Sequence, residues 1–124
     1  MKKKTIVIKW LPKPAHKDYP AAESFLTLLF SPKRASSLVK KLRKASTTAF
    51  LAKDILRASE TPIDQVQAYD WVKENAEMQK GILVSPLLLI RQNTGGRLIV
   101  ADGFHRLCAA FARDQDVQVP CKIV

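Results

Sequence analysis

One stretch constrains this chain most, because it joins an expected strand to an expected helix through a single glycine. Leu98 to Ala101 are residues that favour a strand, Asp102 and Gly103 follow, and the apolar, Ala-rich run 107–112 favours a helix. Gly103 relieves the steric limits on a sharp turn. The first residues of a helix present backbone N–H groups and the positive end of the helix dipole, which attract anions. The stretch therefore predicts a phosphate-binding turn.

Each residue of the turn has a role in that prediction and an ordinary structural alternative. Gly103 would let the backbone approach a phosphate, and Arg106 would bind it with its planar guanidinium fork. His105 would donate to a phosphate oxygen or transfer a proton. Asp102 would hold Mg²⁺ or act as a base, and Phe104 would pack inward or cover a nucleobase. The alternatives are a simple strand–helix turn, a surface ion pair of Arg106, a structural histidine and Asp102 as a helix cap.

A hydroxyl nucleophile at such a turn would need an acidic side chain nearby to activate it. We consider Glu23, in the expected first helix, as this catalytic candidate. It would act together with Asp102 and His105.

The positive charge of the chain lies in its first half. Residues 1–57 hold 14 Lys and Arg against 3 acids, a net +11, whereas residues 58–124 hold 7 against 8, a net −1. A helix expected to begin at Ser31-Pro32 has an apolar face and a cationic face. The cationic face favours nucleic acid, with a merely solvated surface as the alternative; its residues are Lys33, Arg34, Lys40, Lys41, Arg43 and Lys44.

The remaining pattern predicts an α+β fold, in which a small mixed β-sheet carries packed helices. At 124 residues the chain is expected to form one domain. Strands are expected at 5–11, 46–52, 86–91, 97–101 and 117–124, helices at 19–30, 32–44 and 64–79, a helical turn at 54–57 and a hairpin turn at 93–96.

The two cysteines, Cys108 and Cys121, lack metal-ligand spacing and are expected to be buried free thiols. A cytoplasmic protein is the default that follows. No apolar run reaches the roughly 20 residues that span a bilayer, so no membrane partner is expected. The oligomeric state stays open, with a homodimer among the alternatives.

The order of features from Asp64 to Val124 resembles that of the ParB/sulfiredoxin-like superfamily. A helix, the segment Gly81-Ile82-Leu83-Val84-Ser85-Pro86, an apolar strand and a second strand precede Asp-Gly-Phe-His-Arg, an Ala-rich helix and Val-Pro-Cys-Lys-Ile-Val. The resemblance implies a core over 47–124 that binds a nucleotide (ATP, ADP or CTP), with Mg²⁺ in some branches. It implies that residues 1–46 are a basic amino-terminal extension with a helical insert.

The turn lies between the branches of that superfamily. ParB partition proteins carry Gly-Glu-Arg-Arg, so Phe104 replaces the Glu and His105 the first Arg. Sulfiredoxins carry Gly-Cys-His-Arg, so Phe104 replaces the nucleophilic Cys and the thiol chemistry is lost. Free serine kinases carry Asp-Gly-His-x-Arg, which Asp102, Gly103 and Arg106 match, with His105 shifted by one position.

Our first hypothesis is therefore a DNA-associated binding or regulatory domain that holds a nucleotide or nucleic-acid phosphate at Asp102–Arg106. The second is a Mg²⁺-dependent kinase of a small molecule, of the free amino acid type, or a nucleotide hydrolase. The third is a non-catalytic interaction protein that kept the fold. Whether the chain is an enzyme stays open at this point.

Overall fold

A four-stranded mixed sheet forms the centre of the computed structural model, which describes residues 7–62, 71–91 and 96–124. The strand order is β1-β4-β2-β3, with β4 antiparallel to β1 and parallel to β2, and β2 antiparallel to β3. The strands are β1 (Thr48–Leu51), β2 (Leu87–Ile90), β3 (Ile99–Asp102) and β4 (Gln118–Ile123). The predicted α+β class with a small mixed sheet is confirmed.

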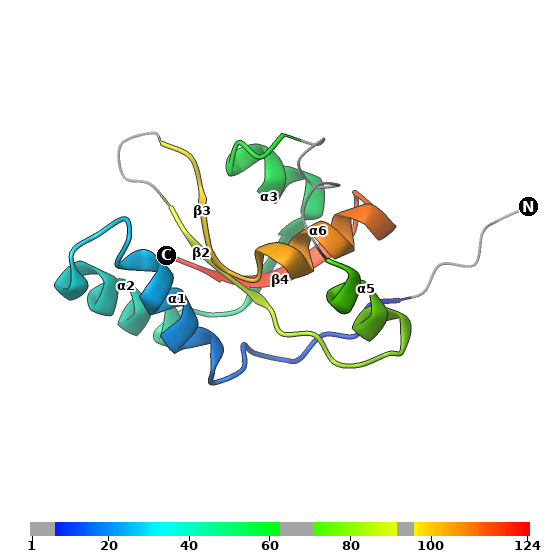
Figure 1. Cartoon of the computed structure of the whole chain (residues 1–124), viewed down its shortest axis with the longest axis horizontal. Coiled ribbons are helices and arrows are strands. Elements are labelled where there is room, and N and C mark those ends of the chain that lie inside the picture. The colour runs from blue at the N-terminus through cyan, green and yellow to red at the C-terminus, as the bar shows by residue number, and fades with distance from the viewer. Residues whose placement is uncertain (1–6, 63–70, 92–95) are drawn as a thin grey trace, which may run out of the picture.

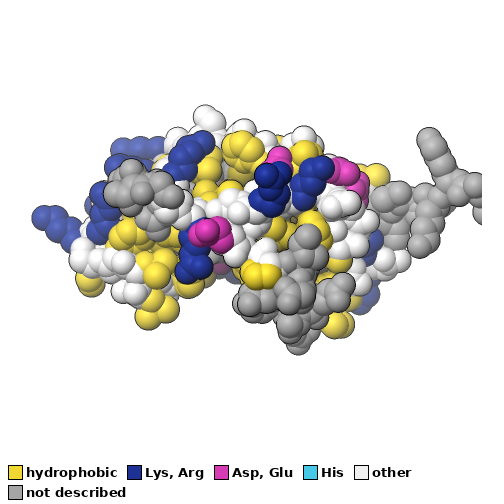
Figure 2. Space-filling view, turned by 90° about the horizontal axis from the view of Figure 1, so that it is seen from above, with side chains coloured by type: hydrophobic (Ala, Val, Ile, Leu, Met, Phe, Trp, Pro, Cys, Tyr) yellow, Lys and Arg dark blue, Asp and Glu magenta, His cyan; other side chains and the backbone are white. Residues whose placement is uncertain are grey.

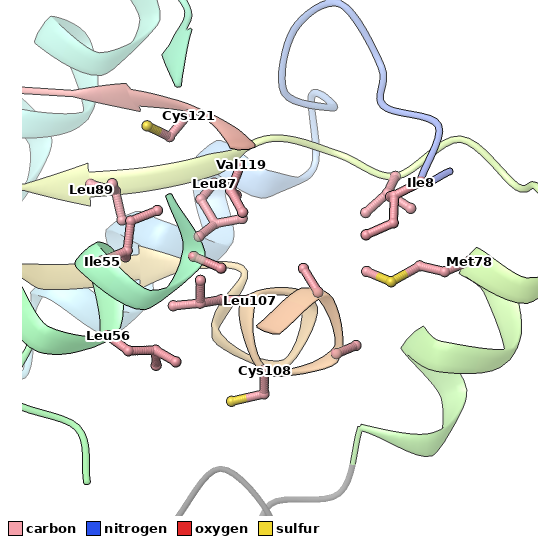
Figure 3. Close-up of a cluster of buried hydrophobic side chains, with 14 residues drawn as sticks. Ile8, Ile55, Leu56, Met78, Leu87, Leu89, Leu107, Cys108, Val119 and Cys121 are labelled. Atoms are coloured by element: carbon pink, nitrogen blue, oxygen red, sulfur yellow. The ribbon is translucent and has the colours of Figure 1, made fainter. Parts of the chain in front are cut away.

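Helices cover both faces of this sheet (Figure 1). On one face lie α1 (Asp18–Leu26) and α2 (Pro32–Lys44), and on the other α3 (Ala52–Ala58) and α6 (Phe104–Arg113), with α5 (Val72–Gln79) packed against α6. Because side chains alternate along a strand, β2 serves both layers. Leu87 and Leu89 join the cluster of α3, α5 and α6 (Figure 3), while Leu88 and Ile90 join that of α1 and α2.

Helix α2 forms as its sequence predicts. The Ser31 hydroxyl accepts a hydrogen bond from the Arg34 backbone N–H at 3.2 Å, and Pro32 occupies the first turn, where no N–H is needed. Its apolar residues, spaced three and four apart, are buried. At its carboxyl end, the buried Lys122 of β4 donates its Nζ to the Arg43 carbonyl oxygen at 2.9 Å.

Helix α1 is shorter and more exposed than expected. It ends at Leu26, and Leu28 and Leu29 are 81% and 53% exposed. After Leu26 the chain continues as tight turns, in which the Leu28 and Leu29 N–H groups donate to the Phe25 and Leu26 carbonyls, each at 3.0 Å. The expectation of a helix over 19–30 was therefore wrong for residues 27–30.

The amino-terminal strand is also smaller than predicted. Within 7–11 only an isolated parallel bridge forms, between Trp10 and Val84, with the Leu11 N–H donating to the Val84 carbonyl at 2.8 Å. Pro12 follows directly and has no N–H to continue the ladder. The expected turn at 54–57 is part of the longer α3. The helix predicted over 64–79 is present as α5 in its second half, and residues 64–70 lie outside the described residues. The first residues of the predicted amino-terminal strand, 5–6, and most of the predicted hairpin turn, 93–95, also lie outside them.

Cys108 on α6 and Cys121 on β4 are buried free thiols, as predicted. Burial raises the pKa of each to about 11, so both remain protonated at neutral pH. Within the described ranges no helix is both long and apolar enough to span a membrane.

Candidate functional site

The predicted turn joins β3 to α6, and only glycine fits at its centre. Gly103 has φ +99°, the left-handed region that side-chain-bearing residues avoid. A Cβ at this position would lie 2.8 Å from Arg106 Nη2 and 3.0 Å from Leu87 Cγ. The first helical bond runs from the Leu107 N–H to the Gly103 carbonyl at 2.9 Å, no side chain caps the helix, and its first turn contains no acid.

A cavity of about 350 Å³ opens at this turn, and we call it the turn cavity. The structure brings all five predicted residues, Asp102 to Arg106, to its wall. Ala21 and Phe25 of α1 line the cavity as well, and Glu74 of α5 contributes a carboxylate from the other face of the sheet. The cavity therefore lies at the β3 end of the sheet, where elements from both layers meet.

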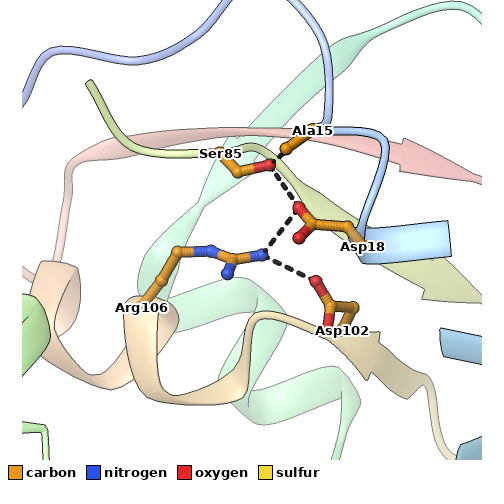
Figure 4. A network of polar contacts seen from close by, with 5 residues as sticks. All are labelled: Ala15, Asp18, Ser85, Asp102 and Arg106. Carbon is orange, nitrogen blue, oxygen red and sulfur yellow. Dashed lines mark hydrogen bonds and ion pairs between the residues drawn. The ribbon is translucent and has the colours of Figure 1, made fainter. Parts of the chain in front are cut away.

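Arg106 is the centre of a polar network (Figure 4). Its Nη2 lies 2.9 Å from Asp102 Oδ2 and 3.4 Å from Asp18 Oδ2. Asp18, at the start of α1, is only 4% exposed and also accepts a hydrogen bond from the Ser85 hydroxyl. Ser85 Oγ in turn accepts the Ala15 N–H at 3.0 Å. The network ties α1 and the segment before β2 to the β3–α6 turn.

The structure shows the ion-pair role of Arg106 that was considered as the alternative, because its Nη2 contacts two carboxylates. These contacts link the turn to α1. The phosphate-binding role of the guanidinium stays a prediction. Its Nε is buried without a hydrogen-bond partner among the described residues.

The electrostatic environment of Asp102 favours its protonated form. Burial is the largest cause, and it raises the pKa of this carboxyl above its ordinary value. The hydrogen bond and charge of Arg106 oppose the shift, while the neighbouring carboxylate of Asp18 adds to it. Asp102 is therefore a weaker acid than an exposed aspartate.

The acidic side chain that lines the turn cavity beside Asp102 is not Glu23, the one expected from the sequence. Glu23 is half-buried on α1 and is not among the residues that line the turn cavity. Glu74 lines the cavity, whereas Asp18 does not line it and is linked to the turn through its ion pair with Arg106. Neither residue was among those predicted from the sequence. Asp18 is the first residue of α1, where an acid interacts favourably with the positive end of the helix dipole. Its partner Arg106 is 88 residues away, so only tertiary packing brings the two together.

Phe104 and His105 differ in exposure. Phe104 is half-buried and packs against the α3–α5–α6 cluster, whereas His105 is exposed, with the two ring centroids 6.3 Å apart. Both roles considered for Phe104 remain compatible with this position, because its ring also borders the turn cavity.

The cationic residues predicted on α2 are all exposed, and the helix contains no acid. Figure 2 shows Lys and Arg side chains gathered at the end of the molecule that carries α1 and α2. One of these cations has a structural contact, since the Arg43 guanidinium lies 4.4 Å above the Tyr19 ring. The other five are Lys33, Arg34, Lys40, Lys41 and Lys44.

Comparison with family models gave no match for this chain, and neither a curated protein nor a solved structure matched it.

Proposed function

We propose that the turn cavity binds the phosphate chain of a nucleotide together with Mg²⁺. The observation that carries the proposal is the glycine-only turn at Gly103, which opens a ten-residue helix onto a cavity large enough for a phosphate chain. Helix starts of this kind attract anions through backbone dipoles. The sequence resemblance to the ParB/sulfiredoxin-like superfamily supports the same class of ligand.

The charges around the cavity argue for a metal ion as part of the ligand. Asp102 and Glu74 line the cavity with two carboxylates, and the Arg106 cation is already paired with Asp102 and with the buried Asp18. A bare polyphosphate would be repelled by the excess of carboxylates. Mg²⁺ is usually held by one or two carboxylates plus substrate phosphates, and it would neutralise the charge between them.

The residues that line the cavity fit that arrangement. Asp102 and Glu74 face it from different elements and would provide the carboxylate oxygens. Over the described ranges no three His, Cys, Asp or Glu side chains are grouped so that they could hold a metal. We therefore expect metal and nucleotide to bind together, each weakly alone. His105, exposed at the helix start, would donate to a phosphate oxygen.

Calorimetric titration with ATP, ADP and CTP, each with and without Mg²⁺, tests this proposal. We expect at least one nucleotide to bind, with affinity lowered about tenfold or more when Mg²⁺ is removed. His105→Ala should weaken binding, and His16→Ala is its control, because His16 is an exposed histidine outside the cavity lining. Absence of binding by all three nucleotides in the presence of Mg²⁺ would contradict the proposal.

A second candidate function, nucleic-acid binding, is favoured by the exposed cationic face of α2. Each phosphate that the protein neutralises releases counterions, so affinity for duplex DNA should fall steeply as salt is added. In a plot of the logarithm of the binding constant against the logarithm of the salt concentration, each phosphate contact contributes a slope of roughly −0.9. Changing Lys40, Lys41 and Lys44 to Gln should lower that slope by about two to three. DNA affinity that does not respond to salt would exclude this role of α2.

A further inference from the structure

A second cavity, of about 430 Å³, adjoins the turn cavity, and we call it the edge cavity. The two share Phe25, Val100 and Phe104 in their walls. The edge cavity continues along β3, the last strand in the sheet order, and reaches the end of α3. A ligand with its phosphates at the turn would extend past the two phenyl rings into this second space.

Two of the three residues shared by the cavities are aromatic: Phe25 is exposed, and Phe104 is half-buried. Phe25 is 41% exposed, and Leu29, which lines the edge cavity, is 53% exposed. Flat apolar surfaces of this kind stack nucleobases, whose faces are compatible with any aromatic ring. Phe25 and Phe104 lie where the cavities meet, so the base of a nucleotide would contact them once its phosphates occupy the turn.

The lining of the edge cavity also includes a carboxylate residue, Glu60, whose backbone conformation is one that residues with side chains disfavour. Glu60 has φ +56° and is the only non-glycine residue with positive φ in the part of the chain that the structure describes. It ends α3, because its N–H donates to the Arg57 carbonyl and the Thr61 N–H to that of Leu56, each at 3.0 Å. Glycine is the usual residue at this position. A disfavoured backbone conformation in a residue that lines a cavity points to a use for its side chain.

We propose that the edge cavity binds the nucleoside part of the nucleotide, with the base against Phe25 and Phe104 and its exocyclic amino group donating to the Glu60 carboxylate. This inference rests on the proposed function. A carboxylate accepts from the N4 amino group of cytosine and the N6 amino group of adenine, and it repels the carbonyl oxygen that uracil or hypoxanthine has there. Glu60 therefore favours the amino nucleotide over its keto counterpart, CTP over UTP or ATP over ITP, in whichever pair the site binds.

The test measures Mg²⁺-dependent binding of these two nucleotide pairs and of inorganic tripolyphosphate. In at least one pair we expect the amino nucleotide to bind about tenfold more tightly than its keto counterpart and than tripolyphosphate. Glu60→Gln should remove the preference within that pair, because an amide offers both a donor and an acceptor. Phe25→Ala should weaken nucleotide binding more than tripolyphosphate binding, because Phe25 lines both cavities.

Two variants control for folding and for charge. Glu60→Gly places the preferred residue at the helix end, so it should lose the base preference while keeping the fold. Glu77→Gln removes an acid of α5 that lines neither cavity and should change nothing. If tripolyphosphate binds and neither pair is discriminated, the nucleoside inference is overturned while the proposed function stands. If neither tripolyphosphate nor any nucleotide binds, both are overturned.

Discussion

Arg106 connects the proposed chemistry to the stability of the fold at the scale of single residues. It is the only cation shown to contact Asp18 and Asp102 among the described residues, and Asp18 is buried. Removing one partner of a buried ion pair leaves an uncompensated charge, which costs far more than removing both. The network is therefore expected to behave as one unit.

Arg106→Met should accordingly lower the free energy of unfolding by roughly 3 kcal/mol, because two carboxylates lose their cation. Urea denaturation at neutral pH measures this change. The double variant Asp18→Asn/Arg106→Met should recover part of the loss, since one of the stranded charges is then gone. Equal stability of the wild-type protein and Arg106→Met would show that the network contributes nothing to the fold.

The raised pKa of Asp102 predicts a pH dependence of stability. A carboxyl whose pKa is higher in the folded than in the unfolded protein binds more protons when folded. Its contribution to stability is complete below its ordinary pKa of 3.8 and is lost as the pH rises through the folded value. Compared with Asp102→Asn, which does not titrate, the wild-type protein should lose stability as the pH rises from about 3.8. A wild-type protein that gains stability relative to Asp102→Asn as the pH rises would refute the raised pKa of Asp102.

At the scale of elements, local sequence predicted helices and strands well where a stop or start signal was present. Ser31-Pro32 and the apolar spacing defined α2, and the glycine at 103 defined the β3–α6 junction. Prediction failed where tertiary packing decides. Neither the short bridge at Trp10 nor the early end of α1 is encoded in apolar content alone, since both depend on how the chain must turn next.

The end of α3 provides a prediction at this scale. Glu60 adopts a left-handed conformation that costs a residue with a side chain about 1 kcal/mol relative to glycine. Glu60→Gly should therefore raise the free energy of unfolding by up to about 1 kcal/mol, as measured by thermal or urea denaturation. A loss of stability would mean that the Glu60 side chain has stabilising contacts that outweigh its backbone conformation.

At the scale of the whole molecule, the site depends on contacts that join distant parts of the sequence. The motif at 102–106 could be read directly, because its residues are contiguous and glycine has a defined conformational use. Asp18, Ser85 and Glu74 could not, since they come from three separate segments that only the packed sheet brings to the turn. The amino-terminal half thus contributes a buried carboxylate to the site as well as the cationic face of α2.

The most direct test of Mg²⁺–nucleotide binding at the turn uses the two histidines of the chain, His16 and His105. Both are exposed, and only His105 lines the turn cavity. Their imidazole resonances can be followed by NMR while ATP, ADP or CTP is added in the presence and absence of Mg²⁺. The account predicts that at least one nucleotide shifts the His105 signals saturably, only with Mg²⁺, and leaves those of His16 in place. Signals of His105 that stay unmoved at millimolar concentrations of every nucleotide with Mg²⁺ would contradict it.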